Sequence, residues 1–319
     1  MVGAMRFVAL ETHGAPPETA LTVELETNYT EGPSSAAQSY YVVERWTLAR
    51  RVGVQSRTPD RARVFGCPGC GAPQDAVFAG QCRYCKRTVA TGELDWIVRD
   101  MAVVHRETRG PMLTGDTPEQ GTNLRTVVDP AAVATLGQLG AKDPAFGWTA
   151  FQARVGLIFD EFQAAWSARD LARMRPFLSD GLFQTQTYWV EAYKAAHLRN
   201  VSEGARITSI KLARVVSDRF FDAITIRVAA SGLDYTLADD GGRVVSGSRS
   251  RDRVYTEYWT LIRGAARSGP TRTDAACPNC GAALKINMAG TCEYCKAKIS
   301  SGEFDWVLSR IEQDEVYEG

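Results

Sequence analysis

Apolar and polar residues alternate in two series of short segments, and this period of two predicts strands of antiparallel sheets. The first series comprises Met5–Leu10, Thr19–Tyr29 and Glu44–Arg50, and the second comprises Ile207–Val216, Asp222–Ala230 and Glu257–Arg263. The last segment of each series carries the same pattern, Glu-x-Trp-Thr-Leu-x-Arg. The two halves of the chain are therefore predicted to contain copies of one sheet.

A helical pattern precedes the strands of the second copy. Apolar residues recur on one helical face from Trp148 to Ala168. Asp170 is suited to cap a short helix that ends near Pro176, and Ser179 or Asp180 to cap a third helix. Residues 148–265 are thus predicted to form an α+β domain with three helices on a bent antiparallel sheet. The aromatic residues of the helices are expected to pack in its core, with a cofactor pocket as the alternative.

The first copy, residues 1–55, shows strands without such a helical pattern. A sheet with one apolar face is not stable bare in water, so we expect a missing upstream segment or other elements to cover it. Of these two, we favour the missing segment. Residues 105–147 are rich in Gly, Pro and Thr, with one helical pattern at Pro130–Leu139. They are expected to be a linker on the surface.

All eight cysteines fall into two quartets of identical spacing, each made of two Cys-x-x-Cys pairs separated by eleven residues. The quartets are Cys67, Cys70, Cys82 and Cys85, and Cys277, Cys280, Cys292 and Cys295. Two facing pairs supply a tetrahedral sulfur cage, which is typical of structural Zn²⁺. We therefore predict two zinc ribbons, at residues 64–104 and 274–312, with one structural Zn²⁺ each and no open ligand position for catalysis.

Other uses of the cysteines are weaker explanations. Disulfides suit small secreted proteins, whereas this chain is long enough for a hydrophobic core and begins without a secretory hydrophobic region. One redox pair does not explain four cysteines repeated twice. Iron stays open as an alternative to zinc, because a four-sulfur cage suits both metals.

The two ribbons share fifteen of thirty positions at a constant offset of 210 residues. Glycine after the first pair is expected to let the backbone turn toward sulfur, and lysine after the second pair to offset negative charge. A tyrosine between the second cysteines is expected to cover the metal, and a tryptophan at the end to pack on the ribbon. These residues are Gly71 and Gly281, Lys86 and Lys296, Tyr84 and Tyr294, and Trp96 and Trp306.

Composition narrows the possible functions. The 319 residues are 45% hydrophobic, and 37 Lys and Arg balance 37 Asp and Glu. This balance disfavours nucleic acid as a partner. The sequence has no uninterrupted apolar stretch of membrane-spanning length. Metal-bound cysteines indicate a reducing compartment, so we expect a cytoplasmic protein, with peripheral attachment to the cytoplasmic membrane through an upstream segment or a partner as the alternative.

Residues 143–264 resemble the domain named after subunit 44 of the mitochondrial inner-membrane translocase, which also occurs in bacterial proteins. The matching motifs are Phe162-Gln-Ala-Ala-Trp166 with Asp170-Leu171, Arg175-Pro-Phe-Leu-Ser-Asp180, Asp234-Tyr235 and Thr256-Glu-Tyr-Trp-Thr260. The resemblance implies a cone-like fold of the nuclear-transport-factor-2 kind. It also implies a non-enzymatic role in recruiting partners. The ribbons and the duplication look like a bacterial variant of this family.

Three functions follow, of which the first is preferred. It is a zinc-containing scaffold or adaptor that binds a protein partner, with repeated modules suited to multivalent binding. The second is an enzyme or small-ligand binder in the cone pocket. Its candidate residues are His197, Asp222, Asp234 and Glu257 with Tyr235 or Tyr258, although Glu257 recurs as Glu44 and suggests an ion pair with a strand arginine.

The third function is binding to nucleic acid or the ribosome. It would use the basic run Arg50, Arg51, Arg57, Arg61 and Arg63, echoed by Arg263, Arg267 and Arg272. A solvated linker explains this run more simply.

Overall fold

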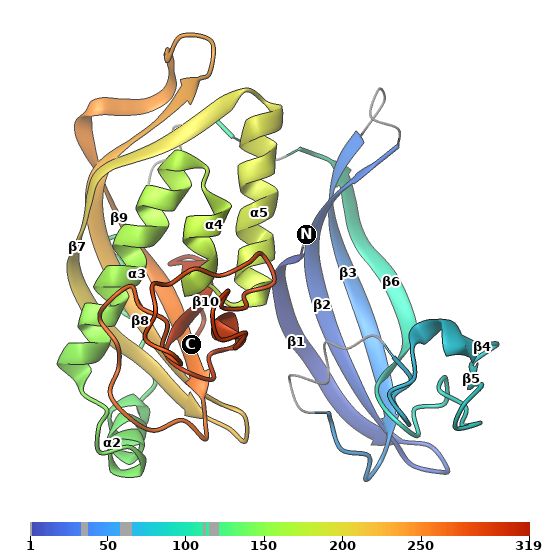
Figure 1. Ribbon diagram of the computed structural model, residues 1–319. Helices are drawn as coiled ribbons and strands as arrows, with labels where there is room; N and C mark the ends of the chain where they lie inside the picture. The colour runs from blue at the N-terminus through green and yellow to red at the C-terminus, as the bar shows by residue number, and fades with distance from the viewer. Residues whose placement is uncertain (1, 33–37, 58–65, 111–112, 115–120) are drawn as a thin grey trace. The chain divides into compact units, whose positions relative to one another are not determined.

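The computed structural model describes residues 2–32, 38–57, 66–110, 113–114 and 121–319 (Figure 1). The chain divides into two compact units, residues 1–111 and residues 112–319. Each unit has its own four-stranded antiparallel sheet, and the two sheets have the same strand order along the chain.

The first unit is a sheet in the order β1-β2-β3-β6 with a small ribbon inserted before the last strand. Its strands are β1 (Val2–His13), β2 (Glu18–Glu31), β3 (Gln38–Arg51) and β6 (Ile97–Thr108). The ribbon holds the 3-10 turn η2 (Gln74–Ala76) and the short strands β4 (Val77–Phe78) and β5 (Gln81–Cys82). Within the described residues of this unit there is no α-helix.

The second unit repeats this arrangement in the order β7-β8-β9-β10 and adds helices. Its strands are β7 (Leu198–Ser217), β8 (Phe221–Ala238), β9 (Val244–Gly264) and β10 (Val307–Gln313), with η4 (Ile299–Ser301) inside the ribbon. The helical elements are α2 (Ala132–Lys142), α3 (Trp148–Ala168), α4 (Leu171–Met174), η3 (Arg175–Phe177) and α5 (Asp180–Ala195). Helices α3, α4 and α5 lie on one face of the sheet (Figure 1).

Helices α4 and α5 begin at the capping residues that the sequence predicts. Helix α3 spans the predicted 148–168, and its apolar stripe is buried against the sheet. The Asp170 carboxylate accepts a hydrogen bond from the Arg173 N–H at 3.0 Å and caps α4, and Ser179 caps α5. The predicted core packing is confirmed for the phenylalanines of α3, because Phe151 and Phe159 are fully buried and Phe162 is 9% exposed.

Both ribbons are insertions rather than ends of the sheets, which differs from the predicted boundaries. Residues 97–104 and 307–312 were assigned to the ribbons, but strands β6 and β10 return to pair with β3 and β9. The alternation in these strands is interrupted by bulges, at Thr47/Leu48 opposite β6 and at Leu308/Arg310 in β10. This interruption hides the strand period in the sequence.

The predicted linker, residues 105–147, was wrong at both ends. Residues 105–108 complete β6, and α2 packs against β7 with Leu139 only 2% exposed. Between them, the stretch before α2 crosses the polar face of the second sheet. There Arg227 is buried and donates to the carbonyls of Leu124 and Gly121 at 2.8 and 2.9 Å and to Asp314 at 2.7 Å. These long-range contacts make residues 121–147 part of the second unit.

Candidate metal centres

The first half of each quartet is a tight turn closed by glycine. In the first ribbon, the Gly71 N–H donates to the Cys67 carbonyl at 2.8 Å, and in the second the Gly281 N–H donates to the Cys277 carbonyl at 2.9 Å. Both glycines have a φ of +75°, which L side chains rarely adopt. These glycines turn the backbone just after the second cysteine of the pair, with their N–H groups on a cysteine carbonyl.

The second half of each quartet is the same turn closed by lysine. The Lys86 N–H donates to the Cys82 carbonyl at 2.9 Å, and the Lys296 N–H donates to the Cys292 carbonyl at 3.0 Å. The lysines have φ values of +62° and +61°. A non-glycine residue held there costs about 1 kcal/mol or more, which the rest of the ribbon must offset. The same left-handed conformation recurs at the same place in both ribbons.

The turns bring the four sulfur atoms of each quartet together. All Sγ atoms of one quartet lie within 4.8 Å of one another. Closer pairs are Cys67–Cys85 at 3.6 Å, Cys70–Cys82 at 3.7 Å and Cys277–Cys295 at 3.8 Å. A tetrahedral ion with bonds of about 2.3 Å to sulfur has ligand separations of about 3.8 Å. A disulfide needs about 2.0 Å. The quartets are therefore shaped to hold a metal ion, and their cysteines are free thiols.

The thiols of a quartet have opposite pKa shifts. Hydrogen bonds from the backbone N–H groups of Cys85 and Tyr84 lower the pKa of Cys82 to about 6. The Asn279 amide, 3.3 Å from the sulfur, lowers the pKa of Cys295 to about 6. Burial raises the pKa of Cys277 to about 12. The lowered pKa of Cys82 and of Cys295 favours a thiolate at these two positions, and a bound cation would stabilise further thiolates beside it.

The two tyrosines between the second cysteines do not cover the sulfur cages. Tyr84 is 73% exposed and Tyr294 is 55% exposed, so the expectation that they shield the metal was wrong. Their positions lie on the outer side of a tight turn, where the side chain projects to solvent while the flanking Sγ atoms point inward. Shielding comes instead from burial of the cysteines at 67, 82, 277 and 292, each at most 2% exposed.

The tryptophan that ends each ribbon packs toward the sheet, which corrects its expected place on the ribbon. Trp306 is fully buried, with its ring 5.2 Å from Phe151 and the Arg263 guanidinium 4.8 Å above it. In the first unit, the Arg50 guanidinium lies 4.3 Å above the Trp96 ring. The equivalent strand arginine therefore stacks on the equivalent tryptophan in both units. Such a cation–π contact stabilises by about 0.5–2 kcal/mol, depending on its exposure.

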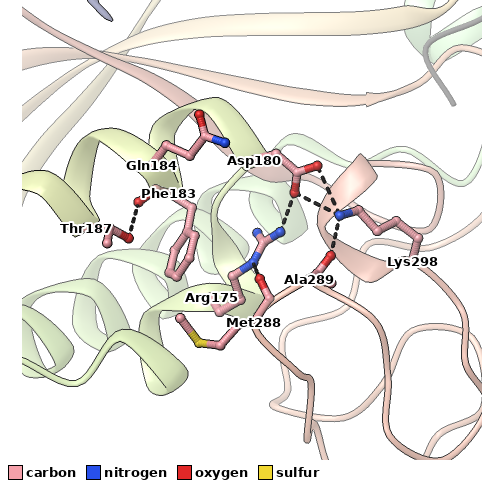
Figure 2. A pocket seen from close by; sticks show the side chains of 8 residues that line it. All are labelled: Arg175, Asp180, Phe183, Gln184, Thr187, Met288, Ala289 and Lys298. Atoms are coloured by element: carbon pink, nitrogen blue, oxygen red, sulfur yellow. Dashed lines mark hydrogen bonds and ion pairs between the residues drawn. The ribbon is translucent and has the colours of Figure 1, made fainter. Parts of the chain in front are cut away.

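The second ribbon is tied to α5 by a charged cluster (Figure 2). Arg175 Nε donates to the Met288 carbonyl at 2.8 Å, and its guanidinium pairs with Asp180. Lys298 Nζ reaches the same carboxylate at 3.0 Å. Burial raises the pKa of Asp180, but the hydrogen bonds from Arg175 and Lys298 outweigh it and leave the pKa lowered. The adjoining cavity of about 430 Å³ is lined by these groups with Phe183, Gln184, Thr187 and Ala289.

The candidate acids and bases for catalysis do not meet in one site. His197 is exposed in a left-handed conformation just beyond α5. Asp222 is fully buried and pairs with Lys142 at 2.9 Å. Asp234 accepts from the Asn200 amide at 2.7 Å. The two aspartates are twelve positions apart on β8, which is about 40 Å along the strand at about 3.3 Å per residue.

The remaining candidates hold the fold together. The Trp259 indole donates to Glu257 at 2.9 Å, and the Trp46 indole donates to Glu44 at 3.0 Å, so the repeated glutamate orients the equivalent strand tryptophan in each unit. The Tyr258 hydroxyl accepts from the Val127 N–H at 2.8 Å. The Tyr235 hydroxyl donates to a glutamate, Glu203, at 2.7 Å.

The described arginines of the two basic runs bind groups of the protein itself. Arg51 lies 3.6 Å from Glu18, and Arg57 lies 2.6 Å from Asp95. In the second run, Arg267 donates to the Phe304 carbonyl at 2.9 Å and Arg272 pairs with Asp274 at 3.0 Å. Arg61 and Arg63 lie outside the described residues. These pairings favour a structural role for the runs over phosphate binding.

The comparisons with known proteins apply to the second unit. Residues 132–272 match the Tim44-like domain. The match begins at α2 and ends before Cys277, so it covers the helices and strands β7–β9 and leaves out the first unit and both quartets. It also begins sixteen residues before the predicted boundary at 148, in keeping with the packing of α2. No curated protein matches the chain.

None of the helices in the described part of the chain combines the length and the apolar character that crossing a bilayer requires.

Proposed function

We propose that this protein is a non-enzymatic adaptor that binds a protein partner, with two structural Zn²⁺ ions. The observation that carries the proposal is the combination of two all-sulfur centres with a Tim44-like domain whose candidate catalytic residues do not meet in one site. The eight cysteines from Cys67 to Cys295 would be the ligands. Bound zinc would cross-link each ribbon and supply folding energy to it.

The arrangement of the units supports this proposal. Each quartet sits in an insertion between the third and fourth strands of a four-stranded sheet, in the same order in both units. Repetition of a module with its own metal centre suits a protein that presents two binding surfaces on one chain. We place it in the cytoplasm or peripherally at the cytoplasmic membrane, within a larger assembly.

A native purification tests the proposal. The tagged full chain is isolated from cells that make it at about 0.1 M and about 0.5 M salt, and both protein and nucleic acid are quantified. The proposal expects a protein at near-stoichiometric amount under both conditions. Co-purification of nucleic acid that is lost at the higher salt, or of a small metabolite without a protein, would contradict it.

A further inference from the structure

One face of the first sheet is apolar, with exposed side chains on its two outer strands; on the inner strands Val23 is buried and the other apolar side chains are partly buried. Register places the same side of four strands in one surface, which we call the open face. Its residues are Met5, Phe7 and Leu10 of β1, Leu21, Val23 and Leu25 of β2, Trp46 and Leu48 of β3, and Val98, Met101 and Val103 of β6. On the two outer strands exposure ranges from 52% at Val98 to 68% at Phe7. A contiguous patch of this kind marks an interaction site.

The opposite side of the same sheet has no comparable need for a partner. Its side chains form cross-strand pairs, among them Arg6 with Glu26 and Arg45 with Glu24 at 3.0 Å. Thr22 and Thr47 hydroxyls meet at 3.3 Å on the same side. The polar groups of this face interact with one another and with water. Binding is therefore expected on the open face alone.

The second unit shows what covers the equivalent face of its own sheet. Trp259, Leu261 and Ile226 occupy the places that Trp46, Leu48 and Val23 occupy in the first sheet, as the shared pattern and register show. In the second unit these residues are at most 1% exposed, beneath an apolar layer supplied by α3, α4 and α5. The matching face of the first sheet thus has the shape and spacing that accept helices.

A charged pair in the second unit adds a requirement for the occupant. Arg263, stacked on Trp306, forms a buried ion pair at 3.0 Å with Asp143, which lies just before the helical layer. The equivalent arginine, Arg50, is stacked on Trp96 in the same way, and its Nη1 donates to Ser56. Among the residues that the structure describes, Arg50 has no carboxylate partner, and its Nε is buried without a hydrogen bond. An occupant that mimics the second unit brings that carboxylate.

We propose that the open face binds amphipathic α-helices of a partner protein, with their apolar side on the sheet and a carboxylate paired with Arg50. The proposal rests on the adaptor function above and assigns its binding surface. Four strands about 4.8 Å apart span about 14 Å, and packed helices lie about 8–10 Å apart, so the face accommodates two helices.

Site-specific photo-crosslinking tests the proposal in the full chain. The photoreactive residue p-benzoylphenylalanine replaces Phe7 or Met101 on the open face, and Arg6 or Asp100 as neighbours on the polar face. Because successive strand residues point to opposite sides, each pair differs only in the face it reports. Both open-face positions are expected to crosslink to one partner segment, which has a helical apolar stripe and an acidic residue. The polar-face positions are expected to give no such product.

A charge exchange then tests the role of Arg50. Arg50→Glu is expected to weaken partner affinity at least about tenfold, and exchange of the partner's acidic residue for arginine is expected to restore it. A circular dichroism spectrum of the variant that matches the wild-type spectrum excludes misfolding as the cause of the weaker binding. Failure of the exchange to restore affinity overturns the charge pairing.

The remaining outcomes separate this inference from the proposed function. Crosslinks from the open face to residues 112–319 of the same chain, to a second copy or to lipid overturn the inference. Equal crosslinking from both faces does the same. If the native purification yields a stoichiometric protein that crosslinks only through other surfaces, the inference fails while the adaptor function stands. If it yields no protein, both fail.

Discussion

The tryptophan that ends each ribbon offers a matched pair of substitutions. Trp306 is fully buried in the core of the second unit, whereas Trp96 is only partly buried at the equivalent place of the first. Trp306→Ala removes a ring that contacts Phe151 and Arg263, and a buried aromatic-to-alanine change costs about 3–5 kcal/mol. For Trp96→Ala we expect about 1–2 kcal/mol, from partial burial and the Arg50 stack.

Hydrogen exchange read separately in each unit measures the two effects. Slow amides of β8 report on the second unit and those of β2 on the first, which avoids treating the chain as one two-state system. At about 1.4 kcal/mol per tenfold, Trp306→Ala should speed exchange in β8 by roughly two to three and a half powers of ten. An acceleration below about tenfold in β8, or an equal effect of Trp96→Ala in β2, would refute the claim that the second ribbon is anchored in the domain core.

Two further predictions follow from backbone geometry and from a buried charge. Gly290→Ala places a Cβ 2.0 Å from the Ser300 hydroxyl oxygen at a φ of +79°, whereas in Gly80→Ala, at +76°, the nearest atom is 3.6 Å away. Gly290→Ala should lower the denaturant midpoint of its own unit clearly more, relative to wild type, than Gly80→Ala lowers that of the first unit. Equal shifts of the two midpoints would count against the cluster in Figure 2. Burial raises the pKa of Asp143, but the Gly269 N–H and the Arg263 charge outweigh it and hold the pKa below 3.8. Its stabilising effect is therefore complete above that pH and lost as pH falls further, so Asp143→Asn should destabilise the second unit at pH 7 with a difference from wild type that shrinks below about pH 4. A difference that stays constant from pH 7 to about pH 3 would show that the ionised carboxylate contributes nothing.

The parts of the fold set by local patterns could be predicted from the sequence. Helix α3 follows from one uninterrupted apolar stripe at 148–168, and Asp170 and Ser179 are caps that act within three residues. The cysteine quartets could also be predicted from the sequence, because the four cysteines of each lie on two tight turns whose spacing brings the sulfur atoms together.

The parts that depend on distant partners could not be predicted. Strands β6 and β10 pair with their neighbours through bulges, which break the alternation of their side chains. The sequence therefore gives no sign that a strand follows each ribbon and returns to the sheet. Residues 121–147 join the second unit through contacts with Arg227 and Arg263, which lie about a hundred residues away in sequence. The sequence around these arginines does not indicate which groups they bind. The outward direction of Tyr84 depends on a turn conformation that composition does not encode.

Native mass spectrometry of the full chain, purified without added metal or chelator, tests the central claim most directly. Two tetrahedral sulfur cages predict a mass increase of two zinc ions per chain, loss of one ion when Cys67 is replaced by serine and of the other when Cys277 is replaced. A chain that carries no metal and whose mass is reduced by disulfide formation, or one that binds a single ion across both quartets, would contradict the account.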